Sequence, residues 1–245
     1  MPGAELIDPA LGLGAAAVVL AGLVRGLAGF GGALVMAPIL SLLWGPAPAV
    51  AMVITIELVG YLQLLPGAAR HIRWREVAPM GLAALAALPL GVWLVVHLPP
   101  EVMRRAIGGI VAVLAALLML GWRARRRPGL PAALGVSALS GLLEGLAGTP
   151  GPPVVLLLYA GPDSAAVNRQ QLIGYFTLLD LAALLLYATQ GAFAAGTLER
   201  TLLLVPVSVA ATWVGGHLFR RAGEQILRWL ALVLILLIGL FGLLA

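Results

Sequence analysis

The chain has 245 residues, of which 62% are hydrophobic and 10% charged, and its mean hydropathy is +1.06. This composition lies far outside the range of soluble globular proteins and leaves no segment for a separate soluble domain, so it indicates an integral membrane protein. The formal charge of +5 does not argue for nucleic-acid binding. In a membrane chain, arginines orient loops against the cytoplasmic face.

Cysteine is absent, which excludes disulfides and thiolate metal sites. The three histidines, His71, His97 and His217, are scattered near expected helix ends and lack the spacing of metal ligands. We therefore expect neither a metal nor another cofactor.

The first apolar segment, Leu11–Trp44, contains a single charge at Arg25. As one helix it would be about 51 Å long, whereas the hydrocarbon core of a bilayer is about 30 Å thick. It must break, and the glycines at 29–32 predict the place, because glycine weakens a helix interior. A re-entrant hairpin and two tilted crossings are both compatible with this break, and both return the chain to its starting side.

Three full spans then complete the first half, and the second half repeats the order after an arginine-rich linker. We expect repeats at residues 1–122 and 131–245, joined by a linker at 123–130, in one membrane domain. The expected helices after the first break are Ala49–Leu65, Val77–Val96, Val102–Trp122, Leu130–Ala147, a short piece from the break at Gly148–Pro153 to Tyr159, Ala165–Thr189, Thr201–Leu218 and Ile226–Leu244.

An internal duplication connects the two broken segments. Residues 22–32 match residues 141–151 at seven of eleven positions, at a shift of 119. Two matching broken apolar segments, one in each half, are the best sequence indication of a binding site in a secondary transporter.

The arginine-rich loops favour one orientation of these repeats. If each broken segment returns to its own side, the loops near Arg70, Arg123 and Arg220 share a face, as the positive-inside rule requires. We therefore predict an all-α polytopic membrane protein with two inverted repeats, each a broken or re-entrant helix hairpin plus three transmembrane helices. Eight single crossings in parallel repeats are the alternative.

The two breaks are the predicted substrate site. Non-helical backbone at membrane depth must be buried in protein or line a water-filled cavity. Helices that restart after Gly32 and Pro152 would present free N–H groups and a positive dipole end to an anion. Close helix packing by small residues is the alternative role of these glycines. The substrate-binding candidates are Gly29, Phe30, Gly31, Gly32, Gly148, Thr149, Pro150 and Gly151, with Arg169 in a cytoplasmic vestibule.

Four charged residues within apolar segments are candidates for coupling or gating, because such charges are costly. Arg25 and Glu144 occupy equivalent positions before the breaks, and we expect them to form an ion pair unless one reaches an interface. Glu57 and Asp180 are candidate proton carriers, since burial disfavours a charged carboxylate. Neutralisation of either by a nearby arginine is the alternative.

The two breaks also carry a family resemblance. Gly-Phe-Gly-Gly at 29–32, followed by Pro38, and Gly-Thr-Pro-Gly-Pro-Pro at 148–153 together resemble the TauE/SafE family of membrane permeases. The resemblance covers essentially the whole chain. It implies transport of small sulfur-containing or organic anions, such as sulfite, sulfoacetate or sulfolactate, most often outward, and it implicates both breaks. The prolines of the second break leave the particular anion open.

We therefore expect a secondary transporter, working by alternating access, in the inner (cytoplasmic) membrane. Its partners would be a small anionic substrate, the lipid bilayer and protons as a coupling ion, and a homodimer is left open. No phosphate-binding loop for ATP is present. An anion channel is one alternative. A membrane-embedded enzyme is another, although no Ser/His/Asp arrangement supports it.

Overall fold

The computed structural model describes residues 9–28, 31–120, 129–193, 196–219 and 224–244. This part of the chain is helical and contains no strand. Gly29, Phe30 and residues 121–128, which include most of the predicted linker, lie outside it. The helices are α1 (Pro9–Ala28), α2 (Gly32–Trp44), α3 (Pro46–Ala68), the 3-10 turn η1 (Ala69–His71), α4 (Trp74–His97), α5 (Pro100–Met119), α6 (Leu130–Ala147), α7 (Gly151–Tyr159), α8 (Ala165–Thr189), α9 (Thr197–Phe219) and α10 (Glu224–Leu244).

Helix lengths agree with a membrane protein. Seven of the described helices are long and apolar enough to cross a bilayer. By contrast, α2 has 13 residues and α7 has nine, so they extend only about 20 Å and 14 Å. Neither reaches across a hydrocarbon core of about 30 Å.

Glycine and proline determine many of the helix ends. Gly31 and Gly45, on either side of α2, have φ angles of 94° and 86°, which favour glycine. Proline begins α3 and α5, where its missing N–H removes no helical hydrogen bond. Inside α4, Pro79 and Pro89 do not end the helix.

Each broken segment folds back as a helical hairpin. In the first, Gly14 near the start of α1 lies beside Trp44 at the end of α2, and Gly32 at the start of α2 lies beside Arg25 near the end of α1. The two helices are therefore antiparallel. In the second, the Ser140 hydroxyl donates to the carbonyl of Pro150 at 2.7 Å and thereby ties α6 to the turn before α7. Each hairpin has one long and one short arm, and the short arms, α2 and α7, favour the re-entrant hairpin over two crossings.

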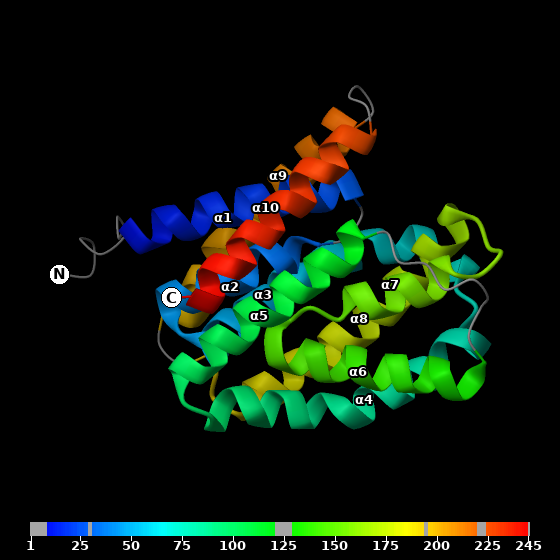
Figure 1. Cartoon of the computed structure of the whole chain (residues 1–245), viewed down its shortest axis with the longest axis horizontal. Helices are drawn as coiled ribbons and strands as arrows, with labels where there is room; N and C mark the ends of the chain where they lie inside the picture. Colours follow the sequence, from blue (N-terminus) through cyan, green and yellow to red (C-terminus); the bar gives the residue numbers. More distant parts are fainter. Residues whose placement is uncertain (1–8, 29–30, 121–128, 194–195, 220–223, 245) are drawn as a thin grey trace.

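Long helices of the first half pack against long helices of the second half. α4 lies along α6 at one edge of the molecule, and α1 lies along α9 at the other (Figure 1). Both pairs depend on glycine: a Cβ at Gly145 would come within 2.6 Å of the Leu88 carbonyl oxygen, and one at Gly215 within 2.6 Å of that of Leu23. Close helix packing by small residues is thus present at these two interfaces.

The chain directions bring the two breaks toward each other. In Figure 1, α1 and α6 run in opposite directions across the molecule, and α1 begins on the side where α10 ends. Helices α3 and α8 pack together between the outer pairs. The largest fully buried side chains include Tyr175, Phe176 and Tyr187 of α8. The site is thus framed by two hairpins and these two central helices.

Candidate functional site

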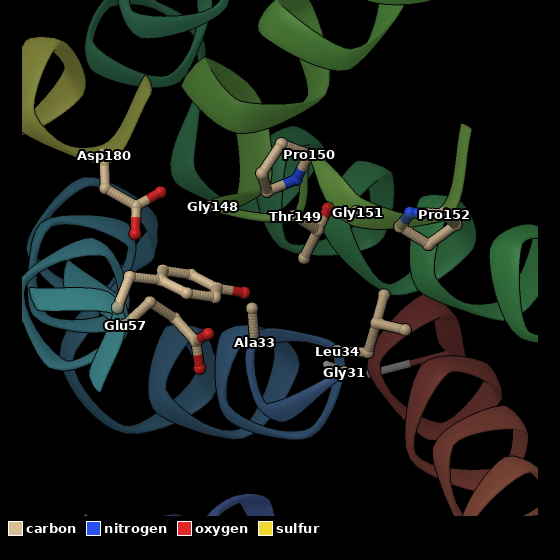
Figure 2. Close-up of a pocket in the computed structure, with 11 residues that line it drawn as sticks. Gly31, Ala33, Leu34, Glu57, Gly148, Thr149, Pro150, Gly151, Pro152 and Asp180 are labelled. Atoms are coloured by element: carbon tan, nitrogen blue, oxygen red, sulfur yellow. The ribbon is translucent and has the colours of Figure 1, made fainter. Parts of the chain in front are cut away.

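The turns of the two hairpins meet at one cavity. Its volume is about 20 Å³, and α3 and α8 contribute acidic side chains to its wall. Figure 2 shows Asp180 and Glu57 on the same side of this cavity, across from Thr149 and Gly151. The lining residues are Gly31, Ala33, Leu34, Glu57, Tyr61, Gly148, Thr149, Pro150, Gly151, Pro152 and Asp180.

At the first break, a carboxylate already faces the start of α2. A Cβ at Gly32 would stand 2.7 Å from Oε1 of Glu57, so only glycine allows this approach. The first N–H groups of a helix have no partner within it and carry partial positive charge. The Glu57 carboxylate therefore lies where the helix dipole stabilises a negative charge.

The second break is built differently. Gly148 ends α6 in the left-handed conformation, with φ 62°, and its N–H bonds to the Glu144 carbonyl oxygen at 2.8 Å. α7 begins with Gly151, and the prolines that follow it have no N–H to donate. Oγ1 of Thr149 is buried and has no hydrogen-bond partner among the described residues. This hydroxyl and the Gly151 N–H are the polar groups that the second break can offer a ligand.

Arg25 is buried between α1 and α3. Its guanidinium donates to the Glu57 carbonyl oxygen at 2.8 Å and to Oε1 of Glu57 at 3.4 Å, and it lies 5.1 Å from the centre of the Tyr61 ring. A Cβ at Gly60 would overlap the guanidinium, so the glycine provides the space that Arg25 occupies. The expected pair of Arg25 with Glu144 is therefore wrong: its carboxylate partner is Glu57, which is one turn from Tyr61 on the same helix.

Glu144 and Asp180 form the corresponding contact of the second half, between α6 and α8. Both side chains are buried, with exposed fractions of 0% and 1%, and they are close enough to influence each other electrostatically. Two ionised carboxylates have no hydrogen to donate, and accordingly neither oxygen of Glu144 meets a donor among the described residues.

Comparison with known proteins identifies the family. The family model described as "Sulfite exporter TauE/SafE" matches residues 14–242. The chain belongs to the TauE/SafE family. It is 32% identical, over 86% of its length and 85% of the relative's, to the probable sulfite/organosulfonate exporter TauE of Cupriavidus necator (strain ATCC 17699). No solved structure matches it significantly.

Family membership also settles two broader expectations. TauE/SafE proteins are transporters rather than enzymes. Together with the seven apolar helices, this makes the chain a multi-pass membrane protein, and in bacteria such proteins lie in the inner membrane.

Not every predicted residue lies at the cavity of this TauE/SafE protein. Arg169 is exposed on the second turn of α8 and does not line the cavity. Its neighbour Asn168 is buried and donates to the Asp163 carbonyl oxygen at 3.4 Å. Gly29 and Phe30 lie outside the described residues. The structure therefore gives no contact between the predicted vestibule and the cavity.

Sequence reasoning missed Tyr61. Its side chain lines the cavity, contacts Arg25 and packs against Phe176 with ring centres 5.2 Å apart. The available signal was its position four residues after Glu57, since residues at this spacing share a helix face.

Hydrogen bonds of Arg73, here called the polar latch, join the two halves of this TauE/SafE protein on one face. Arg73, just before α4, makes two 3.0 Å hydrogen bonds to the carboxylate of Asp163, in the turn after α7. The backbone N–H of Arg73 also donates to Oε1 of Gln171 at 2.7 Å. Separating the first half from the α7–α8 turn on this face would break these bonds.

The cavity is smaller than a sulfur oxyanion. Its volume of about 20 Å³ holds about one water molecule, which requires roughly 10–15 Å³ on the same measure. An anion with four or more heavy atoms needs more room, so the cavity must widen before it can hold one.

Proposed function

We propose that this protein is a secondary transporter that exports a small sulfur-containing or organic anion, such as sulfite or a sulfonate. The name of the Cupriavidus necator relative supports this substrate class. The observation that carries the proposal is the meeting of both helix breaks at one buried cavity. Irregular backbone at membrane depth is tolerated where it lines such a cavity, and there it exposes N–H groups to a ligand.

The second break supplies the unoccupied donors of the proposed site. Thr149 Oγ1 is buried without a partner among the described residues, and Gly151 is the only one of the first three residues of α7 that has a backbone N–H. At the first break, Glu57 already faces the start of α2. We therefore propose that the anion binds mainly to the second break and that the α2 terminus stabilises it through the helix dipole.

Alternating access between two inverted repeats is the proposed mechanism. The opposite directions of α1 and α6 and the exchanged pairing of α1 with α9 and α4 with α6 support a two-fold relation between the halves. The small volume of the cavity and the Arg73–Asp163 contact support a site that must open before it admits the substrate. Movement of one hairpin against the other would open the cavity to one side at a time.

Substrate counterflow in proteoliposomes tests this function. Vesicles loaded with unlabelled sulfoacetate should accumulate labelled sulfoacetate through a carrier, whereas a channel would conduct the anion without such accumulation. Absence of both activities for sulfite and sulfoacetate would contradict the proposal.

A pair of glycine variants links transport to the cavity. Gly151→Val places methyl groups in the cavity, because a Cβ there would meet only Phe176, at 3.7 Å. Gly135→Val in α6 is the matched control, since a Cβ there would have no neighbour within 4 Å. We expect the first to abolish counterflow and the second to preserve it. Gly31 is unsuitable for this test because its φ of 94° strains any side chain.

A further inference from the structure

The buried charges around the cavity do not balance. Among the described residues, the buried side chains that can carry a full charge near neutral pH are Arg25, Glu57, Glu144 and Asp180. One cation thus faces three acids. If all were ionised, the interior would hold two uncompensated negative charges, which a low-dielectric region strongly disfavours.

Arg25 forms an ion pair with one of the three acids, Glu57. Its guanidinium bonds to both the carbonyl and the carboxylate of Glu57, and Gly60 leaves it just enough space to do so. The Arg25–Glu57 pair is therefore neutral as a unit. The excess negative charge falls on Glu144 and Asp180.

Glu144 on α6 and Asp180 on α8 are buried electrostatic neighbours, and Asp180 also lines the cavity. The two oxygens of Glu144 and Oδ2 of Asp180 are buried and have no hydrogen-bond partner among the described residues. Two adjacent carboxyl groups in a dry site cannot both ionise readily, whereas one shared proton supplies the missing hydrogen bond.

Among the described residues, Arg25 is the one buried cation near this pair, and it is bonded to Glu57. The titratable groups around the pair are Arg25 of α1, Glu57 and Tyr61 of α3, and Tyr175 and Tyr187 of α8. The two α8 tyrosines donate to the carbonyl oxygens of Ser137 and Gly145. Helices α2, α4 and α7 carry no ionisable side chain between their end turns.

We propose that Glu144 and Asp180 together bind one proton and that the anion enters the adjacent cavity only when this proton is bound. The inference rests on the function proposed above and identifies proton coupling at the same site. The proton comes from the solution on the side to which the cavity is open, and it leaves with the anion on the other side, so net export requires an outward anion gradient that exceeds the opposing proton gradient. No bond of the anion is made or broken.

If the anion binds only when the proton is bound, two thermodynamic consequences follow. Because coupling between two ligands is reciprocal, anion binding must draw a proton onto the protein at a pH where the pair is otherwise partly ionised. Conversely, the affinity for the anion must fall as the pair loses its proton, by up to about tenfold per pH unit for a single proton.

Proton uptake in a weakly buffered solution tests the proposal on the unmodified protein in detergent. The probe is sulfoacetate, which has no group that titrates near neutral pH, and a pH-sensitive dye reports protons while calorimetry reports binding. We expect the dye to show uptake approaching one proton per bound anion, and the dissociation constant to rise with pH. Binding without uptake and with no dependence on pH overturns the coupling but preserves the transport function. No anion binding at any pH overturns both.

The double variant Glu144→Gln plus Asp180→Asn locates the proton. Both replacements keep the shape of the protonated acids, and Glu101→Gln, at an exposed position of α5, is the control. We expect the double variant to take up no proton when sulfoacetate is added and the control to behave as the unmodified protein does. Proton uptake that persists in the double variant assigns the proton to another group and overturns the proposal. If the double variant does not fold, the measurements on the unmodified protein decide.

Discussion

The two halves place different chemistry at matching positions. Four residues before the first break, Arg25 contacts an acid on α3, whereas four residues before the second break, Glu144 contacts an acid on α8. The first contact is an ion pair with its own hydrogen bonds. The second is a pair of acids with no donor between them while both are ionised. Matching positions of the sequence thus make buried contacts of different charge.

The two halves therefore differ in whether their buried polar groups have partners. In the first half, the buried charges satisfy one another and tie the α1–α2 hairpin to α3. In the second half, Thr149, Glu144 and Asp180 all have buried oxygens without partners among the described residues. Unpaired buried polar groups are costly unless a ligand completes them, so the second half is where substrate and proton are expected to act.

Removal of Arg25 should have the largest effect on stability. Arg25→Met leaves Glu57 buried without its cation, and breaking a buried ion pair in this way costs about 3–5 kcal/mol. We expect a large drop in the thermal unfolding temperature in detergent, and Arg105→Met, at an exposed position of α5, should cause little change. Adding Glu57→Gln to Arg25→Met should restore part of the loss. A double variant no more stable than the single variant would contradict the pairing.

Gly60→Ala should be the next most disruptive change. The new Cβ would overlap the Arg25 guanidinium, and overpacking of this kind costs about 1–3 kcal/mol. Gly67→Ala, on the same helix with no neighbour within 4 Å, should be neutral or stabilising. Equal unfolding temperatures for the two variants would mean that Arg25 does not occupy this space.

The two buried glutamates should respond differently to removal of their charge. Glu144→Gln should leave the unfolding temperature at neutral pH unchanged or slightly higher, because a glutamine amide can donate to Asp180 as a protonated acid would. Glu57→Gln should lower it, because Arg25 loses its counter-charge. The reverse order would show that Glu144 is the ionised acid and Glu57 the neutral one.

Breaking the polar latch at Arg73 should reduce stability least. Arg73→Met breaks the bidentate contact with Asp163, but both residues are near solvent and exposed ion pairs contribute little. We expect a small change in unfolding temperature that shrinks further as salt is added. If the latch closes one side of the site, the same variant should change the transport rate more than the stability.

The breaks and spans could be predicted because strong local signals specify them. A 34-residue apolar run must break, and the glycines near Gly31 and the prolines after Gly151 indicate where. The predicted helix ends lie within a few residues of the observed ones. Serine at position 164 caps α8, and proline begins α3 and α5, which are features readable from sequence.

The buried contacts could not be predicted in the same way. The duplication pointed to Arg25 and Glu144 as a pair, but it contained no information on helix rotation, and Arg25 faces α3 instead. The close approach of Glu57 to Gly32 depends on tertiary packing. The role of Gly60 was also hidden, since a glycine in an apolar helix is usually assigned to helix packing.

The most direct test of the central claim, that the two breaks form an anion site, uses the absence of native cysteine. Thr149→Cys introduces a unique thiol at the cavity wall, and its modification can be timed with small anionic and cationic thiol reagents of similar size. We expect faster modification by the anionic reagent at slightly acidic pH and protection by sulfoacetate. Equal rates for the two reagents, with no protection by sulfoacetate, would contradict the claim.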